Sequence, residues 1–163
     1  MDIQINSFDV QAYFFRAMQG GYASDTKPEK NTPLPGWKTL RHELGDFQLV
    51  DMWHTTPDST HSSGVTTIFY KRVLVWVMHY GGSYSDEAIP TLRAALKQNY
   101  EQAIFIGGRG PIEFTQGKYL YVNDPRGSGS DFEHFEGSEF IDDTELHERI
   151  GYHWYRGEWL LED

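Results

Sequence analysis

Seven histidines are the first residues in this chain whose chemistry invites a metal ion. No pair has the His-x3-His spacing on a predicted helix, and no HExxH motif occurs. His147 and His153 share one face of a predicted strand, but six residues at about 3.3 Å each separate them by roughly 20 Å. A shared zinc ion needs ligand atoms within about 2.1 Å of the metal. The sequence therefore predicts no metal site and no cofactor.

Asp51 and His79 are the candidates for acid–base chemistry. Asp51 falls on a strand face rich in aromatic side chains, where burial would raise its pKa and suit a general acid or base. The alternative is a carboxylate that accepts hydrogen bonds from a neighbouring turn. His79 falls on the opposite face, which is predicted to be interior, and a hydrogen-bonded structural histidine is more common there than a catalyst.

Arg109 lies in a glycine-rich segment, residues 107–111 (GGRGP). The segment lacks the Gly-Lys-Ser/Thr end of a phosphate-binding loop, and no helix is predicted to follow it. Arg109 could still hold a carboxylate or a phosphate through two parallel hydrogen bonds. No Gly-x-Ser-x-Gly motif occurs, and no Ser-His-Asp arrangement can be argued from spacing.

The stretch 131–148 is acidic and contains no Lys or Arg. It lacks the D-x-[DN]-x-[DN]-G spacing of a calcium loop. We interpret it as a solvated hairpin tip, with a docking site for a basic partner as the alternative.

Composition excludes several classes of protein. Lys and Arg number 14 against 24 Asp and Glu, which gives a net charge of −10 and argues against binding to nucleic acid or to an anionic membrane surface. Without cysteine, the chain has no disulfide, zinc thiolate site or catalytic thiol. The N-terminus lacks the pattern of a secretory signal, and no apolar run approaches 18 residues. A cytoplasmic location is the default expectation.

Hydrophobic periodicity predicts an α+β domain over residues 1–163. One helix is expected from Phe8 to Gly20 with Ser7 as its cap, and another from about Ser85 to Gln102. Loops are predicted at 22–35 and 124–131. Strands are predicted at 47–54, 65–70, 73–80, 118–123, 137–141 and 145–155, with weaker candidates at 38–44 and 112–115.

The two halves of the chain, about 8–82 and 86–157, resemble each other. Residues 45–51 (GDFQLVD) match 117–123 (GKYLYVN) at an offset of 72, and Gly64 matches Gly137 at 73. Residues 76–82 (WVMHYGG) lie opposite 151–157 (GYHWYRG) at 75. The offset grows only across predicted turns, as insertions in a duplicated unit would make it grow. We therefore predict two units, each a helix plus an antiparallel meander, with both helices on one side of a sheet.

Alternation along the strands assigns side chains to two faces. The face with Val73, Val75, Val77 and His79 is mostly aliphatic and is predicted to meet the helices. The opposite face, here called the aromatic face, carries Phe47, Trp53, Trp76, Tyr80, Tyr119, Tyr121 and Tyr155. It has three explanations: a second core layer packed by loops 22–35 and 124–136, a homodimer interface, or a ligand pocket. The predicted ligand-binding residues are Trp53, Trp76, Tyr80, Arg109, Tyr119, Tyr121, Asn123, His153 and Tyr155.

Several short motifs resemble a bacterial domain family of unknown function, over roughly residues 8–158. They are 20–23 (GGYA), 45–47 (GDF) with Asp51, 75–81 (VWVMHYG), 109–111 (RGP), 117–121 (GKYLY) and 135–139 (FEGSE). The resemblance implies a cytosolic sensor-like module, because family members occur alone or behind helix-turn-helix DNA-binding domains in regulators. The chain departs from the family at 55–63, which lacks the usual glycine–aromatic hairpin, and no helix-turn-helix precedes the domain. The family carries no established catalytic residues.

These observations predict a non-catalytic domain that binds a small molecule or another protein, self-associating through the aromatic face. The alternative from another class is a small hydrolase or isomerase that uses Asp51 and a nearby histidine in an aromatic cleft.

Overall fold

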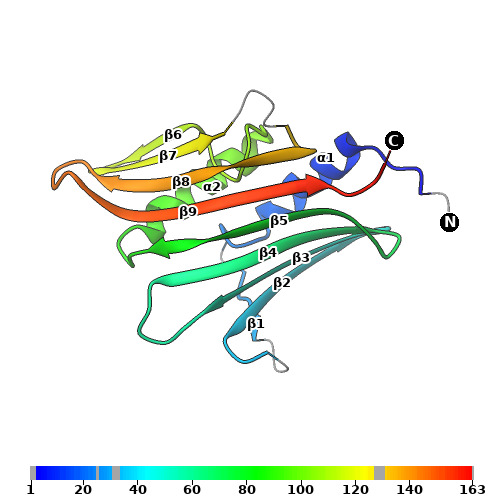
Figure 1. Cartoon of the computed structure of the whole chain (residues 1–163), viewed down its shortest axis with the longest axis horizontal. Helices are drawn as coiled ribbons and strands as arrows, with labels where there is room; N and C mark the ends of the chain where they lie inside the picture. Colours follow the sequence, from blue (N-terminus) through cyan, green and yellow to red (C-terminus); the bar gives the residue numbers. More distant parts are fainter. Residues whose placement is uncertain (1–2, 25, 31–33, 127–130, 163) are drawn as a thin grey trace.

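Two helices and nine strands make up the molecule, a computed structural model that describes residues 3–24, 26–30, 34–126 and 131–162 (Figure 1). The strands form a single antiparallel sheet in the order β1-β2-β3-β4-β5-β9-β8-β7-β6. The architecture is therefore α+β and mostly sheet, as the sequence predicts. No helix within the described ranges is long and apolar enough to cross a membrane.

Both predicted helices form, with different N-termini. Helix α1 spans Ser7–Gln19, and its cap is Asn6, whose Oδ1 accepts a hydrogen bond from the Asp9 amide. The prediction of Ser7 as the cap is therefore wrong by one residue. Helix α2 spans Ile89–Gln102 and starts later than predicted, because Pro90 occupies its first turn and residues 85–88 form turns.

Every predicted strand is present, and most are longer than predicted. A two-residue strand, β1, lies inside the segment 22–35 that was predicted to be a loop, because its backbone pairs with the edge of β2. Of the predicted loop 124–131, residues 127–130 lie outside the described ranges. The strands are β1 Glu29–Lys30, β2 Trp37–Leu44, β3 Phe47–Thr55, β4 His61–Tyr70, β5 Val73–Tyr84, β6 Glu113–Gln116, β7 Tyr119–Pro125, β8 His134–Asp143 and β9 Glu148–Trp159.

Apart from the short strand β1, the two halves of the chain share one order of elements. A helix and four consecutive antiparallel strands, α1 and β2–β5, are followed by α2 and β6–β9. The last strands of the two halves, β5 and β9, pair at the middle of the sheet. Each of these strands also carries a β-bulge, at Val75 in β5 and at Ile150 in β9.

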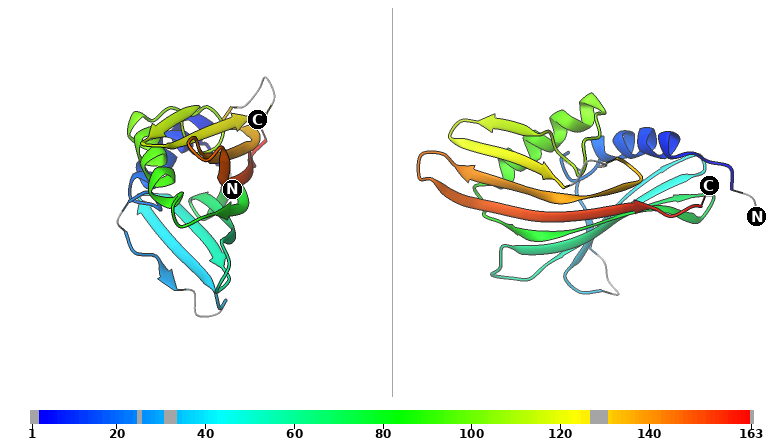
Figure 2. Two further views of the ribbon diagram at one scale, coloured as in Figure 1. Left: turned by 90° about the vertical axis from the view of Figure 1, so that its left-hand side faces the viewer. Right: turned by 45° about the horizontal axis from the view of Figure 1, so that its top comes forward.

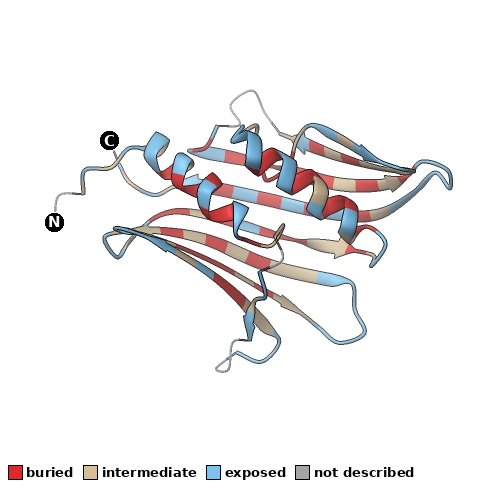
Figure 3. Cartoon of the chain, turned by 180° about the vertical axis from the view of Figure 1, so that it is seen from behind, coloured by how far each residue is buried: buried red, intermediate tan, exposed pale blue. Residues whose placement is uncertain are grey.

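The sheet is bent, and both helices lie on its inner side (Figure 2). They cover the middle of the sheet, whereas the strands toward β1 extend beyond them (Figure 3). Phe14 of α1 packs against Trp76 of β5, with 5.3 Å between ring centroids, and Trp76 is fully buried. The aromatic face is therefore the face that meets the helices.

The prediction that the aliphatic face meets the helices is wrong. On the outer side, Trp154 is 44% exposed, and His79 is exposed rather than interior. Because helices lie on one side only, the outer face of this antiparallel sheet is left uncovered, and half-exposed valines are tolerated on strands. Val75 is buried despite its phase because the bulge turns it inward. Trp76 and Tyr80 of the aromatic face are buried within the chain itself.

Candidate functional site

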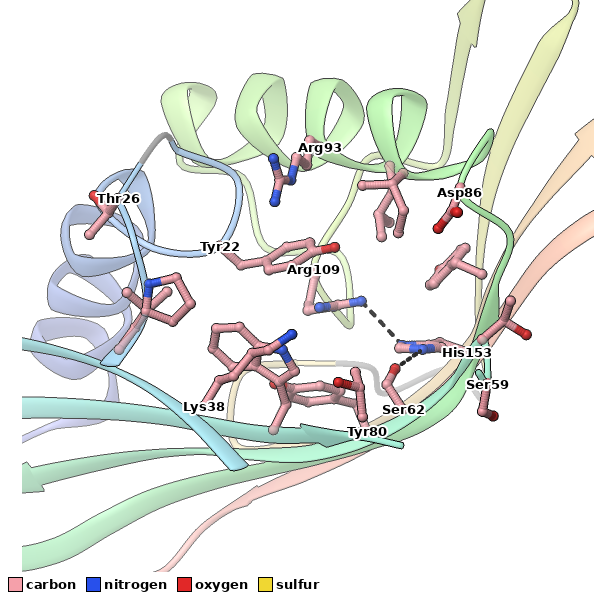
Figure 4. Close-up of a pocket in the computed structure, with 18 residues that line it drawn as sticks. Tyr22, Thr26, Lys38, Ser59, Ser62, Tyr80, Asp86, Arg93, Arg109 and His153 are labelled. Atoms are coloured by element: carbon pink, nitrogen blue, oxygen red, sulfur yellow. Dashed lines mark hydrogen bonds between the residues drawn. The ribbon is translucent and has the colours of Figure 1, made fainter. Parts of the chain in front are cut away.

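A cavity of about 320 Å³ opens between the inner side of the sheet, α2 and the segment that follows α1 (Figure 4). Strands β2–β5 and β9 supply its floor, and α2 supplies one wall through residues such as Leu92 and Arg93. The lining residues are Tyr22, Thr26, Pro28, Lys38, Leu40, Trp53, Thr55, Ser59, Thr60, Ser62, Tyr80, Tyr84, Asp86, Ile89, Leu92, Arg93, Arg109 and His153. The cavity therefore combines aromatic walls with cationic and hydroxyl groups.

Arg109 reaches the cavity from the loop between α2 and β6. Two side-chain amides hold this loop: Asn123 Nδ2 donates to the carbonyls of Gly107 and Gly110 at 2.8 and 3.1 Å, and Asn99 Nδ2 donates to the carbonyl of Arg109 at 3.0 Å. Gly108 has a φ of +68°, and a Cβ there would lie 2.5 Å from the Tyr155 ring. The loop therefore needs glycine to pass this close to β9.

The charge of Arg109 is balanced inside the protein by Glu139 of β8. Arg109 is 6% exposed and Glu139 is 0% exposed, and Arg109 Nη2 forms an ion pair with Glu139 Oε1. The Tyr121 hydroxyl donates to the other carboxylate oxygen at 2.7 Å. Burial opposes the ionisation of Glu139. The Arg109 charge and these hydrogen bonds outweigh the effect of burial, and together they lower the pKa of Glu139. The pair is ionised at neutral pH.

His153 of β9 connects this ion pair to a hydroxyl at the cavity. Its Nδ1 lies 3.5 Å from Arg109 Nη2, and its Nε2 lies 3.1 Å from Ser62 Oγ. Burial, with the adjacent Arg109 charge, lowers the pKa of His153 to about 3. The imidazole is therefore neutral at pH 7. Since a guanidinium can only donate, Nδ1 accepts and Nε2 carries the proton that is donated to Ser62.

Asp51 lies beneath the cavity floor rather than on its surface. Its Oδ1 accepts hydrogen bonds from the Tyr80 hydroxyl at 2.8 Å and from Thr66 Oγ1 at 2.9 Å. Burial raises the pKa of Asp51, and these two hydrogen bonds oppose the rise. Tyr80 separates the carboxyl from the cavity, and the Arg109 guanidinium lies over the Tyr80 ring at 4.9 Å. No histidine in the described part of the chain forms a hydrogen bond with Asp51.

The structure brings together only some of the predicted site residues. Trp53, Tyr80, Arg109 and His153 line the cavity. Trp76, Tyr121, Asn123 and Tyr155 are buried in the core and do not line the cavity. Tyr119 lies apart from the cavity, where its hydroxyl donates to Glu87 Oε2 at 3.2 Å, and His79 is on the outer side.

Glu139 is the most consequential residue that sequence reasoning missed. It belongs to the acidic stretch 131–148, which was interpreted as a solvated hairpin tip. That interpretation is wrong for Glu139 and for Asp143, which is 1% exposed. Glu139 alternates in phase with Gly137 and Ile141 along the predicted strand 137–141, so alternation applied to that strand could have placed Glu139 on the same face as Ile141.

Lys38, Tyr84 and Arg93 also line the cavity without having been predicted. The alternation was not applied to the weak strand candidate 38–44 that contains Lys38, and Arg93 belongs to the polar side of its helix. Within the described ranges, no group of three or more His, Asp or Glu side chains could hold a metal ion.

Comparison with protein-family models places residues 58–157 in one family. The match covers β4 through β9, with α2 and the loop of Arg109 between them. Comparisons with curated proteins and with solved structures find no match. Because the matched region is more than half of the chain, this protein belongs to the family described as domain of unknown function (DUF5680).

Proposed function

We propose that this chain is a non-catalytic domain that binds a small organic molecule in the cavity beside Arg109. The observation that carries the proposal is a buried arginine, Arg109, that lines a cavity with aromatic walls and is 6% exposed. A guanidinium is a charged donor that forms strong hydrogen bonds. A ligand acceptor in the cavity can meet the exposed edge of this guanidinium.

The size and the chemistry of the cavity support this role. A volume of about 320 Å³ is at the lower end of the range for small-molecule sites. Trp53, Tyr22 and Tyr80 offer flat apolar surfaces, and Ser62 offers a hydroxyl whose own proton is free, because His153 donates to its oxygen. Apolar walls with a few convergent polar groups are typical of a binding site.

A hydrolase or isomerase is the second candidate, favoured by the raised pKa of Asp51. Two features oppose it. Asp51 is hydrogen-bonded to Thr66 and Tyr80 rather than to a histidine. His153 lies next to Ser62, but the positive charge of Arg109 and burial lower its pKa to about 3. A general base works best with a pKa near the working pH, so this imidazole is a poor partner for a serine nucleophile.

An internal duplication accounts for the way in which the site is built. Asp51 and Asn123 occupy corresponding positions, and each accepts a hydrogen bond from a tyrosine of its own half, Tyr80 or Tyr155. We propose that both halves kept this structural pair, and that both supplied charged groups to the cavity, Lys38 from the first half and Arg93 and Arg109 from the second. The resemblance to domains of bacterial regulators fits a sensor in the cytoplasm whose ligand alters a partner. Self-association through the aromatic face stays a prediction.

Calorimetric titration with a neutral aromatic probe, 2-(1-naphthyl)ethanol, tests the binding role. We expect saturable binding to the wild-type chain. Thr60→Trp, at the exposed rim of the cavity, should weaken that binding by filling the entrance. Thr115→Trp, at an exposed position of β6 outside the cavity, is the matched control and should leave binding unchanged. Absence of binding, or equal binding by both variants, contradicts the proposed function.

A further inference from the structure

Three of the four charged side chains that line the cavity are cations, although the chain as a whole has a net charge of −10. Lys38 comes from β2, Arg93 from α2, and Arg109 from the loop after α2. The Arg93 guanidinium lies 5.0 Å from the centroid of the Tyr22 ring, which holds it at the wall. The fourth, Asp86, lies toward His153, away from Lys38 (Figure 4).

The two other carboxylates of this region do not face the cavity. Glu139 is occupied by Arg109 and by the Tyr121 hydroxyl. Asp51 is occupied by the hydroxyls of Tyr80 and Thr66. Both are buried, and neither lines the cavity. The charges that a ligand meets in the cavity are therefore mostly positive.

Donors that converge from several elements favour a ligand that supplies only acceptors. The exposed edge of the Arg109 guanidinium can donate, and the Ser62 hydroxyl can donate once it has accepted from His153. Lys38 and Arg93 add charged donors, which form the stronger hydrogen bonds with anionic oxygens. The surrounding rings of Tyr22, Trp53 and Tyr80 match a flat apolar body.

We infer that the ligand is a small organic monoanion with a flat apolar body, of the aryl carboxylate class. The inference rests on the proposed function and adds the charge of the ligand. The carboxylate would lie among Lys38, Arg93 and Arg109, with its ring against the aromatic wall that Trp53 and Tyr22 form together. At about 320 Å³ the cavity suits one or two fused rings and excludes larger acyl chains.

Three probes that share a naphthyl ring and differ in charge test this inference by calorimetry: 1-naphthylacetate, 2-(1-naphthyl)ethanol and 2-(1-naphthyl)ethylamine. We expect the anion to bind about tenfold more tightly than the alcohol, since one charge-assisted hydrogen bond contributes roughly that factor. The amine should bind most weakly. The double variant Lys38→Met/Arg93→Met should abolish the preference for the anion while still binding the alcohol. Lys97→Met, an exposed cation one turn along α2 and outside this cavity, should keep the preference.

The outcomes separate the two proposals. If the alcohol binds as tightly as the anion, or if the double variant keeps the preference, the inference on charge is overturned while the binding role stands. If none of the three probes binds, both proposals fail. Raising the salt concentration should weaken the binding of the anion more than that of the alcohol, because salt screens the half-buried Lys38 and the exposed Arg93. An equal effect on both also overturns the inference.

Discussion

Arg109 and Glu139 form a buried ion pair, and its energetics differ from those of a pair on the surface. Removal of one partner leaves an uncompensated charge inside the protein, which costs about 3–5 kcal/mol. We expect Arg109→Met to lower the free energy of unfolding by that amount in urea denaturation. The matched control is Arg149→Met, which breaks an ion pair with Asp142 whose side chains are 50% and 32% exposed. That variant should lose no more than about 1 kcal/mol.

The double variant Arg109→Met/Glu139→Leu removes both charges together. It should be more stable than Arg109→Met alone, because no charge remains buried without a partner. A double variant no more stable than the single one would contradict an ionised pair. The double variant also separates effects on folding from effects on binding. It leaves no buried charge unpaired, but it lacks the cation that the cavity presents to a ligand.

His153 gives the stability a dependence on pH. Its pKa falls from 6.5 in the unfolded chain to about 3 in the folded protein, so the stabilisation is complete above pH 6.5. As the pH falls toward 3, the unfolded chain takes up a proton that the folded protein does not. Between pH 7 and pH 5 the free energy of unfolding should drop by about 2 kcal/mol because of His153.

His153→Gln checks this sign. Glutamine can still accept from Arg109 and donate to Ser62, but it does not titrate. The loss of stability between pH 7 and pH 5 should therefore be about 2 kcal/mol smaller in the variant than in the wild type. Urea denaturation of both proteins at the two pH values measures the difference. Parallel losses would show that the histidine is protonated in the folded state.

At the scale of the elements, each half of the sheet packs a tyrosine over a glycine of the neighbouring strand. A Cβ at Gly64 would lie 2.5 Å from the Tyr80 hydroxyl and 2.6 Å from the Met52 carbonyl. A Cβ at Gly137 would lie 2.4 Å from the Tyr155 hydroxyl and 2.5 Å from the Asp124 carbonyl. The tyrosines reach their acceptors, Asp51 and Asn123, only because these glycines leave room.

Gly64→Ala and Gly137→Ala should each destabilise the protein by about 1–3 kcal/mol, as overpacking does, because backbone atoms as well as the tyrosine must shift. Gly20→Ala is the control, since its Cβ would meet nothing closer than 3.6 Å. Thermal or urea unfolding of the three variants measures the effects. A loss in only one of Gly64→Ala and Gly137→Ala would count against equivalent packing in the two halves.

Periodicity predicted the elements well, because each depends on local features. Alternating β-branched and aromatic residues identified all the longer strands, and Pro90 and Gly20 marked helix boundaries. The helix N-termini were less predictable, since Asn6 and Ser7 are both good caps. The strand β1 could not be predicted, because two polar residues form a strand only when the edge of β2 is beside them.

At the scale of the whole molecule, alternation correctly grouped the side chains of the aromatic face. The prediction of the covered face was wrong. Aliphatic valines and large aromatics are both typical of a core, so only the packing of α1 and α2 decides which face is buried. Four of the eighteen residues that line the cavity were therefore predicted from sequence, namely Trp53, Tyr80, Arg109 and His153. The partnership of Arg109 with Glu139 joins a loop to a distant strand, and spacing along the chain does not reveal such a contact.

The central claim is that the enclosed space beside Arg109 receives a small organic molecule. Isotope-filtered NOE spectra of the labelled protein with 2-(1-naphthyl)ethanol test it most directly, because they report which protons lie next to the probe. We expect cross-peaks from the naphthyl protons to Trp53 of β3, Leu92 of α2 and Tyr22 of the segment after α1, which all line the cavity. Cross-peaks confined to residues of the outer sheet face, such as Tyr152 and Trp154, or none at all, would contradict it.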